Sequence, residues 1–369
     1  RQSGKTTLCR MLFPRKPYVS LEAPDVRARV LEDPRGFLAD HPDGAVLDEV
    51  QRAPELLSYL QVDVDERRRP GRWILTGSQN FALAQGLSQS LAGRSGILTL
   101  LPLSAAELGA ERLESQELLG TLLRGGYPAI HQHRIPPAEW MAAYVATYVE
   151  RDVRQLLAVG DLSVFQTFLG LAAGRAGQIV NLSALGSDAG VSHNTARSWL
   201  GCLEASYVAE RLPPWHGSLT SRLVKSPKLH FLDSGLHCFL LGIRTVDELR
   251  NHPLRGAIFE GWVVSEIRKT RQNRGLSPDL HFFRDAKGLE ADLLVGRGVE
   301  RIAVEIKSGQ TLDRAASESL DRVAGLLLQA TPPIHLEQVL VYGGEGKQRR
   351  KTSTVLGWRD VARHNWGSV

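Results

Sequence analysis

The stretch RQSGKTTLCRML, residues 1–12, places Gly-Lys-Thr-Thr directly before an apolar run that predicts a helix. In such a loop, backbone N–H groups and the helix dipole favour anionic phosphate groups at the helix N-terminus. We expect Lys5 to reach the β- and γ-phosphates of a nucleotide, and the Thr6 hydroxyl to bind Mg²⁺. We also expect the leading glycine of the loop and the first strand of this domain to precede Arg1. The candidate phosphate loop comprises Ser3, Gly4, Lys5, Thr6 and Thr7.

An acidic pair supplies the partner motif that a short Gly-Lys-Thr pattern needs. In GAVLDEVQ, residues 44–51, the apolar run 45–47 predicts a buried parallel strand. Asp48 and Glu49 follow at its carboxyl end, where open α/β sheets bind ligands. We expect Asp48 to hold Mg²⁺, mostly through water, and Glu49 to polarise the attacking water. An isolated Asp-Glu pair is more typical of a solvated turn, so the combination with the loop predicts the nucleotide site.

A further strand is predicted at residues 73–75, within RWILTGSQN at 72–80. Polar residues follow it at Thr76, Ser78 and Asn80. A polar side chain at a strand exit beside Glu49 can orient the water that attacks the γ-phosphate. We assign this role to Ser78.

Arg94 stands between a predicted helix at 83–91 and a predicted strand at 97–101. In ring-forming ATPases, an arginine at this point reaches the neighbouring subunit's site and neutralises charge that develops on the γ-phosphate. The alternative is an exposed arginine that the helix dipole favours at a helix C-terminus. The first interpretation predicts a homo-oligomer.

These motifs resemble the AAA-type ATPases of bacteria and archaea that join an ATPase domain to a C-terminal domain long called uncharacterised. The resemblance implies an ATPase domain at residues 1–110, with ATP and Mg²⁺ as cofactors and ATP hydrolysis as the activity. It extends over nearly the whole chain. The motifs that carry it are RQSGKTTL, AVLDEVQRAPELL, LTGSQN, LAGR, GGYPA, YVATYVERDV, LVKSPKLHFLDSGL and HPLRGAIFEGWVVSEI.

Residues 111–160 are predicted to be a helical lid or connector. Within AEWMAAYVATYVERDVRQLL, residues 138–157, Trp140, Tyr144 and Tyr148 recur at roughly helical spacing and form an apolar stripe. We expect this stripe to pack on the ATPase domain.

Residues 161–245 are predicted to form a winged helix. A short helix at 182–189, a turn at Gly190, and a second helix at 194–203 with Ser192 as its N-cap match a helix-turn-helix. A strand and a returning strand follow and form the wing. Contacts with DNA are expected from His193, Asn194, Thr195, Arg197 and Ser198 on the second helix and from Arg222, Lys225 and Lys228 on the wing. The alternative is a module that docks proteins.

Residues 250–369 are predicted to form a restriction-endonuclease-like α/β domain. Its parts are a long helix that contains Glu260, a hairpin with its turn at 285–288, and the strand IAVEIKSG at 302–309. Glu305 and Lys307 lie on one face of that strand because side chains alternate with period two. We expect Asp292 and Glu305 to bind Mg²⁺, which activates water and stabilises the leaving oxygen, with Glu260 completing the metal shell. Lys307 would stabilise the attacking water or the phosphate.

Composition agrees with a multidomain protein of the cytoplasm. The chain has 369 residues and a formal net charge of +5, which permits nucleic acid as a partner but does not require it. No apolar run is long enough to cross a membrane. Cys9, Cys202 and Cys238 are far apart and odd in number, as in a reducing compartment. The loop GKQRRKTS, residues 346–353, is basic, and it is either solvated or a phosphate contact.

Two hypotheses follow for an α/β protein with a P-loop parallel sheet, a helical lid, a winged helix and a nuclease-like domain. In the first, the ATPase cycle controls the binding or cleavage of DNA. In the second, ATP occupancy is a switch for assembly or partner binding, and the C-terminal domains only bind. Mg²⁺-dependent nicking that is lost with Asp292 and Lys307 separates the two hypotheses.

Overall fold

The structure is a computed structural model, and it describes residues 2–77, 91, 93–109, 117–148, 162–216, 223–296, 299–312, 314–329 and 333–367. The chain divides into two compact units, Arg1–Leu100 and Leu101–Val369. Each unit has its own hydrophobic core and is described by itself below.

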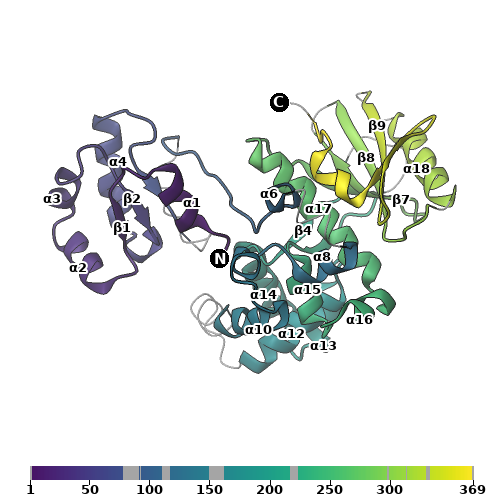
Figure 1. The fold of residues 1–369 in the computed structure, drawn as a ribbon, viewed down its shortest axis with the longest axis horizontal. Coiled ribbons are helices and arrows are strands. Elements are labelled where there is room, and N and C mark those ends of the chain that lie inside the picture. The colour runs from purple at the N-terminus through teal and green to yellow at the C-terminus, as the bar shows by residue number, and fades with distance from the viewer. Residues whose placement is uncertain are drawn as a thin grey trace. The chain divides into compact units, whose positions relative to one another are not determined.

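The first unit contains a three-stranded parallel sheet in the order β1-β2-β3 (Figure 1). The predicted strands at 45–47 and 73–75 are therefore confirmed, because β2 and β3 occupy those positions. β2 is buried along its whole length, and Leu47 packs with Val30 and Leu60 of the surrounding helices. The elements are α1 (Lys5–Leu12), β1 (Tyr18–Ser20), α2 (Pro24–Glu32), α3 (Pro34–Ala39), β2 (Val46–Asp48), η1 (Val50–Arg52), α4 (Leu56–Glu66) and β3 (Ile74–Leu75).

The predicted strand at residues 97–101 is wrong. These residues have no strand conformation, and Ile97 and Leu98 are 65% and 89% exposed. An apolar run becomes a strand only where a neighbouring strand accepts its hydrogen bonds, and no strand among the described residues pairs with this one. The predicted helix at 83–91 and the candidate residues Ser78 and Asn80 lie outside the described residues, apart from Leu91.

The second unit begins with short helices whose aromatic side chains stack on one another. Trp140 and Tyr144 are stacked with ring centroids 5.2 Å apart, and Tyr144 is stacked on Tyr148. Tyr144 and Tyr148 are buried with Phe165 and Trp199 of the following helices. The predicted apolar stripe therefore exists, but its core belongs to the second unit and not to the ATPase domain. The helices are α6 (Ala105–Leu108), α8 (Leu118–Arg124), α9 (Pro128–His133) and α10 (Pro137–Thr147).

The next elements include two helices joined by a tight turn and followed by a two-stranded antiparallel sheet, as predicted. Gly190 adopts a φ of 71° in the turn, a conformation that side chains with a Cβ seldom adopt. The Ser192 hydroxyl accepts a hydrogen bond from the Thr195 N–H at 3.1 Å and caps the second helix. The elements are α12 (Leu162–Gly174), α13 (Leu182–Asp188), α14 (His193–Ala205), β4 (Ala209–Leu212), β5 (Lys228–Phe231), α15 (Ser234–Leu240) and α16 (Val246–Asn251).

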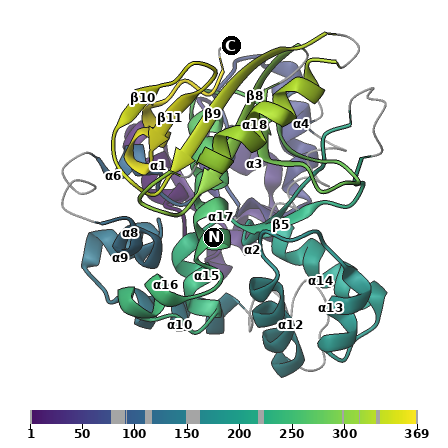
Figure 2. The same cartoon turned by 90° about the vertical axis from the view of Figure 1, so that its right-hand side faces the viewer.

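A six-stranded mixed sheet completes the second unit, in the order β10-β11-β9-β8-β7-β6. On β8, Val304 packs with residues of α17, and Ala303 packs with residues of α18, so helices cover both faces. Figure 2 shows α18 in front of β8 and β9. The long helix and the hairpin predicted from the sequence are confirmed. The elements are α17 (Arg255–Asn273), β6 (Leu280–Arg284), β7 (Glu290–Val295), β8 (Glu300–Lys307), α18 (Arg314–Leu327), β9 (His335–Tyr342), β10 (Lys347–Arg349), β11 (Thr354–Gly357) and η3 (Trp358–Arg363).

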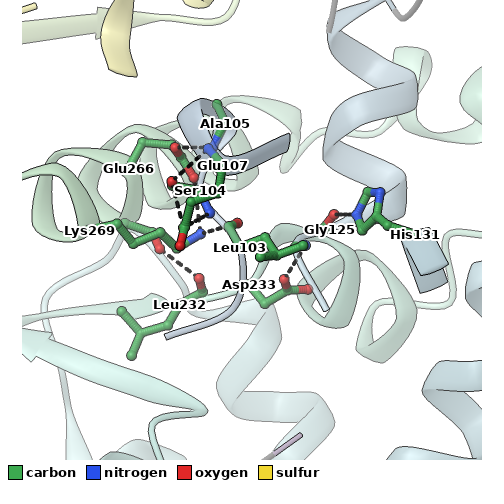
Figure 3. Close-up of polar contacts among 12 residues, drawn as sticks. Leu103, Ser104, Ala105, Glu107, Gly125, His131, Leu232, Asp233, Glu266 and Lys269 are labelled. Carbon is green, nitrogen blue, oxygen red and sulfur yellow. Dashed lines mark hydrogen bonds and ion pairs between the residues drawn. The ribbon is translucent and has the colours of Figure 1, made fainter. Parts of the chain in front are cut away.

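Buried polar side chains of α17 fix the first residues of the second unit (Figure 3). The Ala105 N–H donates to Glu266 Oε2 at 2.7 Å. Lys269 Nζ donates to the Leu103 carbonyl oxygen at 3.2 Å and pairs with Glu266 Oε1 at 3.0 Å. Glu266 and Lys269 are almost fully buried, so each satisfies the other's charge as well as a backbone group.

A second contact closes the same network around Asp233, the N-cap of α15. Its carboxylate accepts hydrogen bonds from the Gly126 N–H at 2.7 Å and the Leu236 N–H at 2.8 Å. The Gly126 carbonyl in turn accepts from the Leu103 N–H at 2.8 Å. A Cβ on Gly126 would lie 2.4 Å from the Leu103 carbonyl oxygen, so only glycine permits this approach.

Candidate functional site

The first candidate site surrounds Asp48, at the carboxyl end of β2. The Thr6 hydroxyl, on the first turn of α1, donates to Asp48 Oδ2 at 2.8 Å. The hydroxyls of Tyr18 and Thr76, which belong to β1 and to the exit of β3, also donate to this carboxylate. Parallel strands bring these side chains to the same edge of the sheet. The structure thus brings together the loop threonine and the strand aspartate that the sequence predicted to share Mg²⁺.

Hydrogen bonding keeps Asp48 ionised although it is buried. Burial is the largest influence on its pKa and acts to raise it, but hydrogen bonds from Thr76, Tyr18 and Thr6 outweigh burial and lower the pKa. The same environment raises the pKa of Tyr18 to about 12, through burial and then through its bond to Asp48. A fixed anionic oxygen beside a threonine hydroxyl is a donor set that suits Mg²⁺. The residues present therefore fit the metal.

The candidate phosphate loop leads into α1 through Gly4, which has a φ of 89°. The Gly4 carbonyl accepts the first helical hydrogen bond, from the Leu8 N–H at 2.9 Å. Ser3 is buried, and among the described residues its hydroxyl has no hydrogen-bond partner. A buried polar group without a partner costs free energy. The loop therefore holds a polar group that a ligand would satisfy.

Glu49 adopts an uncommon backbone conformation next to Asp48. Its φ and ψ are 58° and 45°, a left-handed region that costs energy for a residue with a Cβ. The neighbouring Val50 N–H donates to the Thr76 carbonyl at 3.0 Å, and the Gln51 amide donates to the Glu49 carboxylate. These bonds hold the residue in place, and strain of this kind is common at functional sites.

Arg94 forms an ion pair within its own unit. Its Nε lies 2.5 Å from Asp65 Oδ1, and both side chains are more than one-third exposed. The hydrogen bond to Asp65 raises the pKa of Arg94. An arginine that reaches a neighbouring subunit would have to exchange this partner.

The second candidate site, which we call the carboxylate cluster, consists of Lys228, Glu260, Glu290, Asp292 and Glu305, with Lys307 at its edge. Lys228 Nζ lies 3.1 Å from Glu260 Oε1 and 4.0 Å from Asp292 Oδ1, and it also contacts Glu290. Lys307 Nζ lies 2.6 Å from Glu305 Oε1. The Ile306 N–H donates to Asp292 Oδ2 at 2.8 Å. The structure thus brings together Glu260, Asp292, Glu305 and Lys307 from three elements.

Two residues of the carboxylate cluster, Lys228 and Glu290, were not predicted from the sequence to belong to it. Lys228 lies on the returning strand β5, as predicted, but it is 2% exposed and its ammonium lies inside the carboxylate cluster, so it cannot contact DNA from the wing. The available signal was the strand KLHF at 228–231, which alternates polar and apolar residues although all four are buried. A buried lysine requires a buried counter-charge. A lysine in a strand that is predicted to be buried therefore predicts an acidic side chain on a neighbouring element.

Burial shapes the electrostatics of the carboxylate cluster. It raises the pKa of Asp292 to about 7, with repulsion from Glu260 as the second cause, and it raises the pKa of Glu305 to about 7, with repulsion from Asp292 as the second cause. The two carboxyls repel each other and titrate as a pair. Burial and then Lys228 lower the pKa of His230 to about 3, so this histidine is neutral beside Glu260.

The carboxylate cluster lies in a cleft of about 1090 Å³, which Arg284, Lys287 and Arg322 also line. Among the described residues, no group of three or more His, Cys, Asp or Glu side chains is arranged to hold a metal ion. Asp292 and Glu305 are oxygen donors whose repulsion a divalent cation would relieve, but an ammonium group already lies among the neighbouring carboxylates. The cleft therefore presents acidic oxygens and basic side chains together.

The predicted DNA-contact residues of α14 form its exposed side. His193, Asn194, Arg197 and Ser198 are exposed, whereas the Thr195 hydroxyl lies 2.9 Å from the capping Ser192 hydroxyl. Lys225 is exposed in the loop before β5. Arg222 lies outside the described residues.

Comparison with known proteins matches three family models to this chain. The models are described as "AAA domain" at residues 1–109, "Domain of unknown function (DUF8612)" at 115–247, and "Domain of unknown function (DUF4143)" at 255–361. Two curated relatives are Uncharacterized protein Rv2008c of Mycobacterium tuberculosis and Uncharacterized protein Mb2031c of Mycobacterium bovis. Each is 31% identical over 315 residues, which are 84% of this chain and 69% of the relative. No described helix is both long and apolar enough to cross a membrane.

Proposed function

The chain belongs to the same family as these two mycobacterial proteins and carries an AAA domain, and on this premise we propose that it couples ATP binding and hydrolysis to the binding or processing of DNA. The observation that most directly supports the proposal is the hydrogen bond of 2.8 Å between Thr6 and Asp48, which joins the phosphate loop to the acidic end of the strand. The C-terminal domain supplies the DNA-directed part of the proposal.

The proposal divides the chain into four parts. Residues 1–110 are the ATPase domain, residues 111–160 are a helical connector, residues 161–245 are a winged helix, and residues 250–369 are a nuclease-like domain. The helix-turn-helix with its two-stranded sheet supports the third part. The order helix, three strands, helix, strand in the C-terminal sheet, with acidic residues on the middle strands, supports the fourth.

At the first site, the chain's own residues would bind the nucleotide phosphates and orient and polarise the attacking water. Lys5 would neutralise charge on the β- and γ-phosphates, and Thr6 and Asp48 would hold Mg²⁺, which supplies charge neutralisation when bound. Glu49 would accept a hydrogen bond from the attacking water, with Ser78 as a second orienting group. Arg94 would act on a neighbouring copy after it leaves Asp65, so the proposal includes a homo-oligomer.

At the carboxylate cluster, Asp292 and Glu305 would hold a divalent metal that activates water for phosphodiester hydrolysis. Glu260 would complete the set of oxygen donors. Lys307, within 2.6 Å of Glu305, would steady the attacked phosphate. These are the residues that the proposal assigns to DNA cleavage.

One observation favours a second candidate function, an ATP-dependent switch whose C-terminal domains only bind partners. Lys228 already provides a positive charge to Glu260, Glu290 and Asp292. A cluster whose negative charge is partly offset by its own lysine has less need of a metal ion. In this alternative, ATP hydrolysis is the only catalysis in the protein.

The test measures ATP hydrolysis and DNA nicking by the full-length protein in Mg²⁺, with and without duplex and single-stranded DNA. We expect hydrolysis that Lys5→Ala abolishes, and nicking that Asp292→Asn and Lys307→Ala abolish while hydrolysis persists. Hydrolysis without nicking would select the switch. ATP binding that is unchanged by Lys5→Ala would refute the phosphate-loop assignment.

A further inference from the structure

A wide groove of about 1470 Å³ lies at the end of the C-terminal sheet where β8 and β9 begin. It is lined by β8, β9, β10 and the segments that follow α17 and η3. Neither the phosphate loop nor the carboxylate cluster contributes a residue to it. Its basic lining residues are Arg271, Arg301, Lys347, Arg349, Arg350 and Lys351.

The groove carries excess positive charge. Three acidic residues, Asp279, Glu300 and Glu337, stand against the six basic ones, so the lining has a net charge of 6 − 3 = +3 with neutral histidines. Only Arg271 among the six forms an ion pair within the described residues, with Asp279 at 3.5 Å. Arg350 donates to the Ser317 hydroxyl at 2.9 Å, and the other four cations form no ion pair among the described residues.

The two cations of strand β10 both line the groove. Lys347 and Arg349 line the groove whereas Gln348 between them does not, because side chains alternate along a strand. β10 is the edge of the sheet, where lysine and arginine also discourage pairing with other chains. Protection of the sheet edge would explain the positive charge on β10 but not the positive charge elsewhere in the groove.

Protection of the edge does not explain Arg301, which comes from the interior strand β8. Its Nε is buried and has no hydrogen-bond partner among the described residues. The buried Oε1 atom of Gln338, which also lines the groove, has none either. Buried polar atoms usually have partners, so the floor of the groove is built for a polar ligand.

We propose that this groove binds the sugar–phosphate backbone of nucleic acid. Its volume exceeds the roughly 300–1,000 Å³ that a small-molecule pocket needs. Its cations come from α17, β8, β10 and the segment after β10, and several separate cations suit a ligand with repeated phosphates. Guanidinium groups bind phosphate through paired hydrogen bonds. Binding to the backbone does not require side chains that contact the bases.

The proposal rests on the proposed function and deepens it, because it names where the nucleic acid is held. β8 runs from Arg301 in the groove to Glu305 and Lys307 in the carboxylate cluster. Arg301 and Lys307 are six positions apart on β8, a distance of roughly 20 Å. Because α18 packs on this face of β8 between the two positions, the groove and the cluster are separate sites at opposite ends of the strand, and the groove is the one that anchors the backbone.

The experiment is a titration of full-length protein against fluorescent duplex and single-stranded DNA over a series of salt concentrations. The test variant is the triple change Lys347→Gln, Arg349→Gln and Lys351→Gln, whose side chains are all exposed. A matched control replaces the exposed Arg29, Arg134 and Arg250 by Gln, which removes the same charge outside the groove.

We expect the groove variant to lose affinity and salt dependence while the arginine control keeps them. Three lost phosphate contacts lower the slope of log K against log salt by about 2.7 for a duplex, which is about 500-fold in affinity at 0.1 M relative to 1 M salt. Equal binding by the groove variant and the arginine control overturns the proposal and leaves the proposed function standing. Absent DNA binding with intact ATP hydrolysis ends both the groove and the DNA part of that function.

The identity of the polyanion is tested in the same titration. Polyglutamate carries repeated charge without phosphate, so it is expected to compete much less well than unlabelled DNA. If it displaces DNA equally well, the groove is a docking surface for an acidic protein and the nucleic-acid assignment is wrong. If the groove variant binds polyglutamate as tightly as the unaltered protein does, polyglutamate binds outside the groove and its displacement of DNA says nothing against the nucleic-acid assignment.

Discussion

Replacing Lys228 with Met tests the carboxylate cluster at its centre. Met preserves most of the apolar stem but removes the ammonium that lies 3.1 Å from Glu260 and 4.0 Å from Asp292. Lys228 is 2% exposed, so water cannot replace that charge without rearrangement. Breaking a buried ion pair by removing one partner costs about 3–5 kcal/mol. At about 2–4 °C per kcal/mol, the melting temperature of the second unit should fall by about 6–20 °C near neutral pH.

The loss of stability should shrink in acid. A carboxyl whose pKa is raised by folding contributes stability below its unfolded value, and that stability is lost as the pH rises through its folded value. Asp292 already has a pKa of about 7, and removing Lys228 raises it further because the lysine stabilises the anion. The unaltered protein also protonates Asp292 as the pH falls below about 7, so the loss shrinks only by the protons that the variant binds in excess. That recovery is at most about 1 kcal/mol for this carboxyl between pH 7.5 and 5.5.

Thermal unfolding of the full chain, followed by circular dichroism at both pH values, measures these effects. Lys225→Met is the matched control, because Lys225 is exposed in the loop just before the same strand. Mn²⁺ should stabilise Lys228→Met more than the unaltered protein, since a divalent cation can occupy the place of the ammonium. A loss below about 1 kcal/mol near neutral pH would refute the ion cluster. A large loss that is equal at both pH values would assign it to packing.

Other perturbations test the remaining features. Glu49→Gln should keep ATP binding and slow hydrolysis by roughly 100-fold or more, as measured in steady-state assays, because a positioned proton acceptor is lost. Arg94→Ala should slow hydrolysis at unchanged ATP affinity, and mixing it with Glu49→Gln should restore part of the rate; a monomer with full turnover contradicts this. Gly126→Ala should lower stability by about 1–3 kcal/mol in urea unfolding, because its Cβ meets a carbonyl oxygen at 2.4 Å. Gly120→Ala, with open space at its Cβ, should be neutral or stabilising and serves as its control. For Asp292→Asn, the fall in stability between about pH 4 and pH 7 should flatten, since the raised pKa of this carboxyl contributes to it.

Local patterns predicted the elements that carry the candidate sites. The apolar run before Asp48 and the alternating strand that ends in Glu305 and Lys307 both have the predicted conformation. Their positions follow from side-chain periodicity and from the rule that parallel strands present ligand groups at their carboxyl ends. Sequence alone was sufficient there because a few neighbouring residues determine the outcome.

Contacts between distant segments could not be read in this way. The hydroxyls of Tyr18 and Thr76 meet Asp48 only because β1 and β3 flank β2. Lys228 joins the carboxylate cluster through a strand outside the C-terminal sheet. The run at 97–101 failed for the same reason, since strand formation depends on a partner that local sequence does not specify.

The polar network around Leu103 also has a consequence for synthesis on the ribosome. The Ala105 N–H and the Glu266 carboxylate that accepts from it are separated by 161 residues. At roughly 5–20 residues per second, about 8–32 s pass between the emergence of the two groups. The strands described in the first unit all lie at or before Leu75, so this sheet can form during that interval. The segment at 103–126 has no partners until α17 is synthesised. A nascent chain stalled before α17 therefore carries a folded sheet in the first unit and an unanchored segment at the start of the second. We expect a chaperone to bind that unanchored segment at this stage.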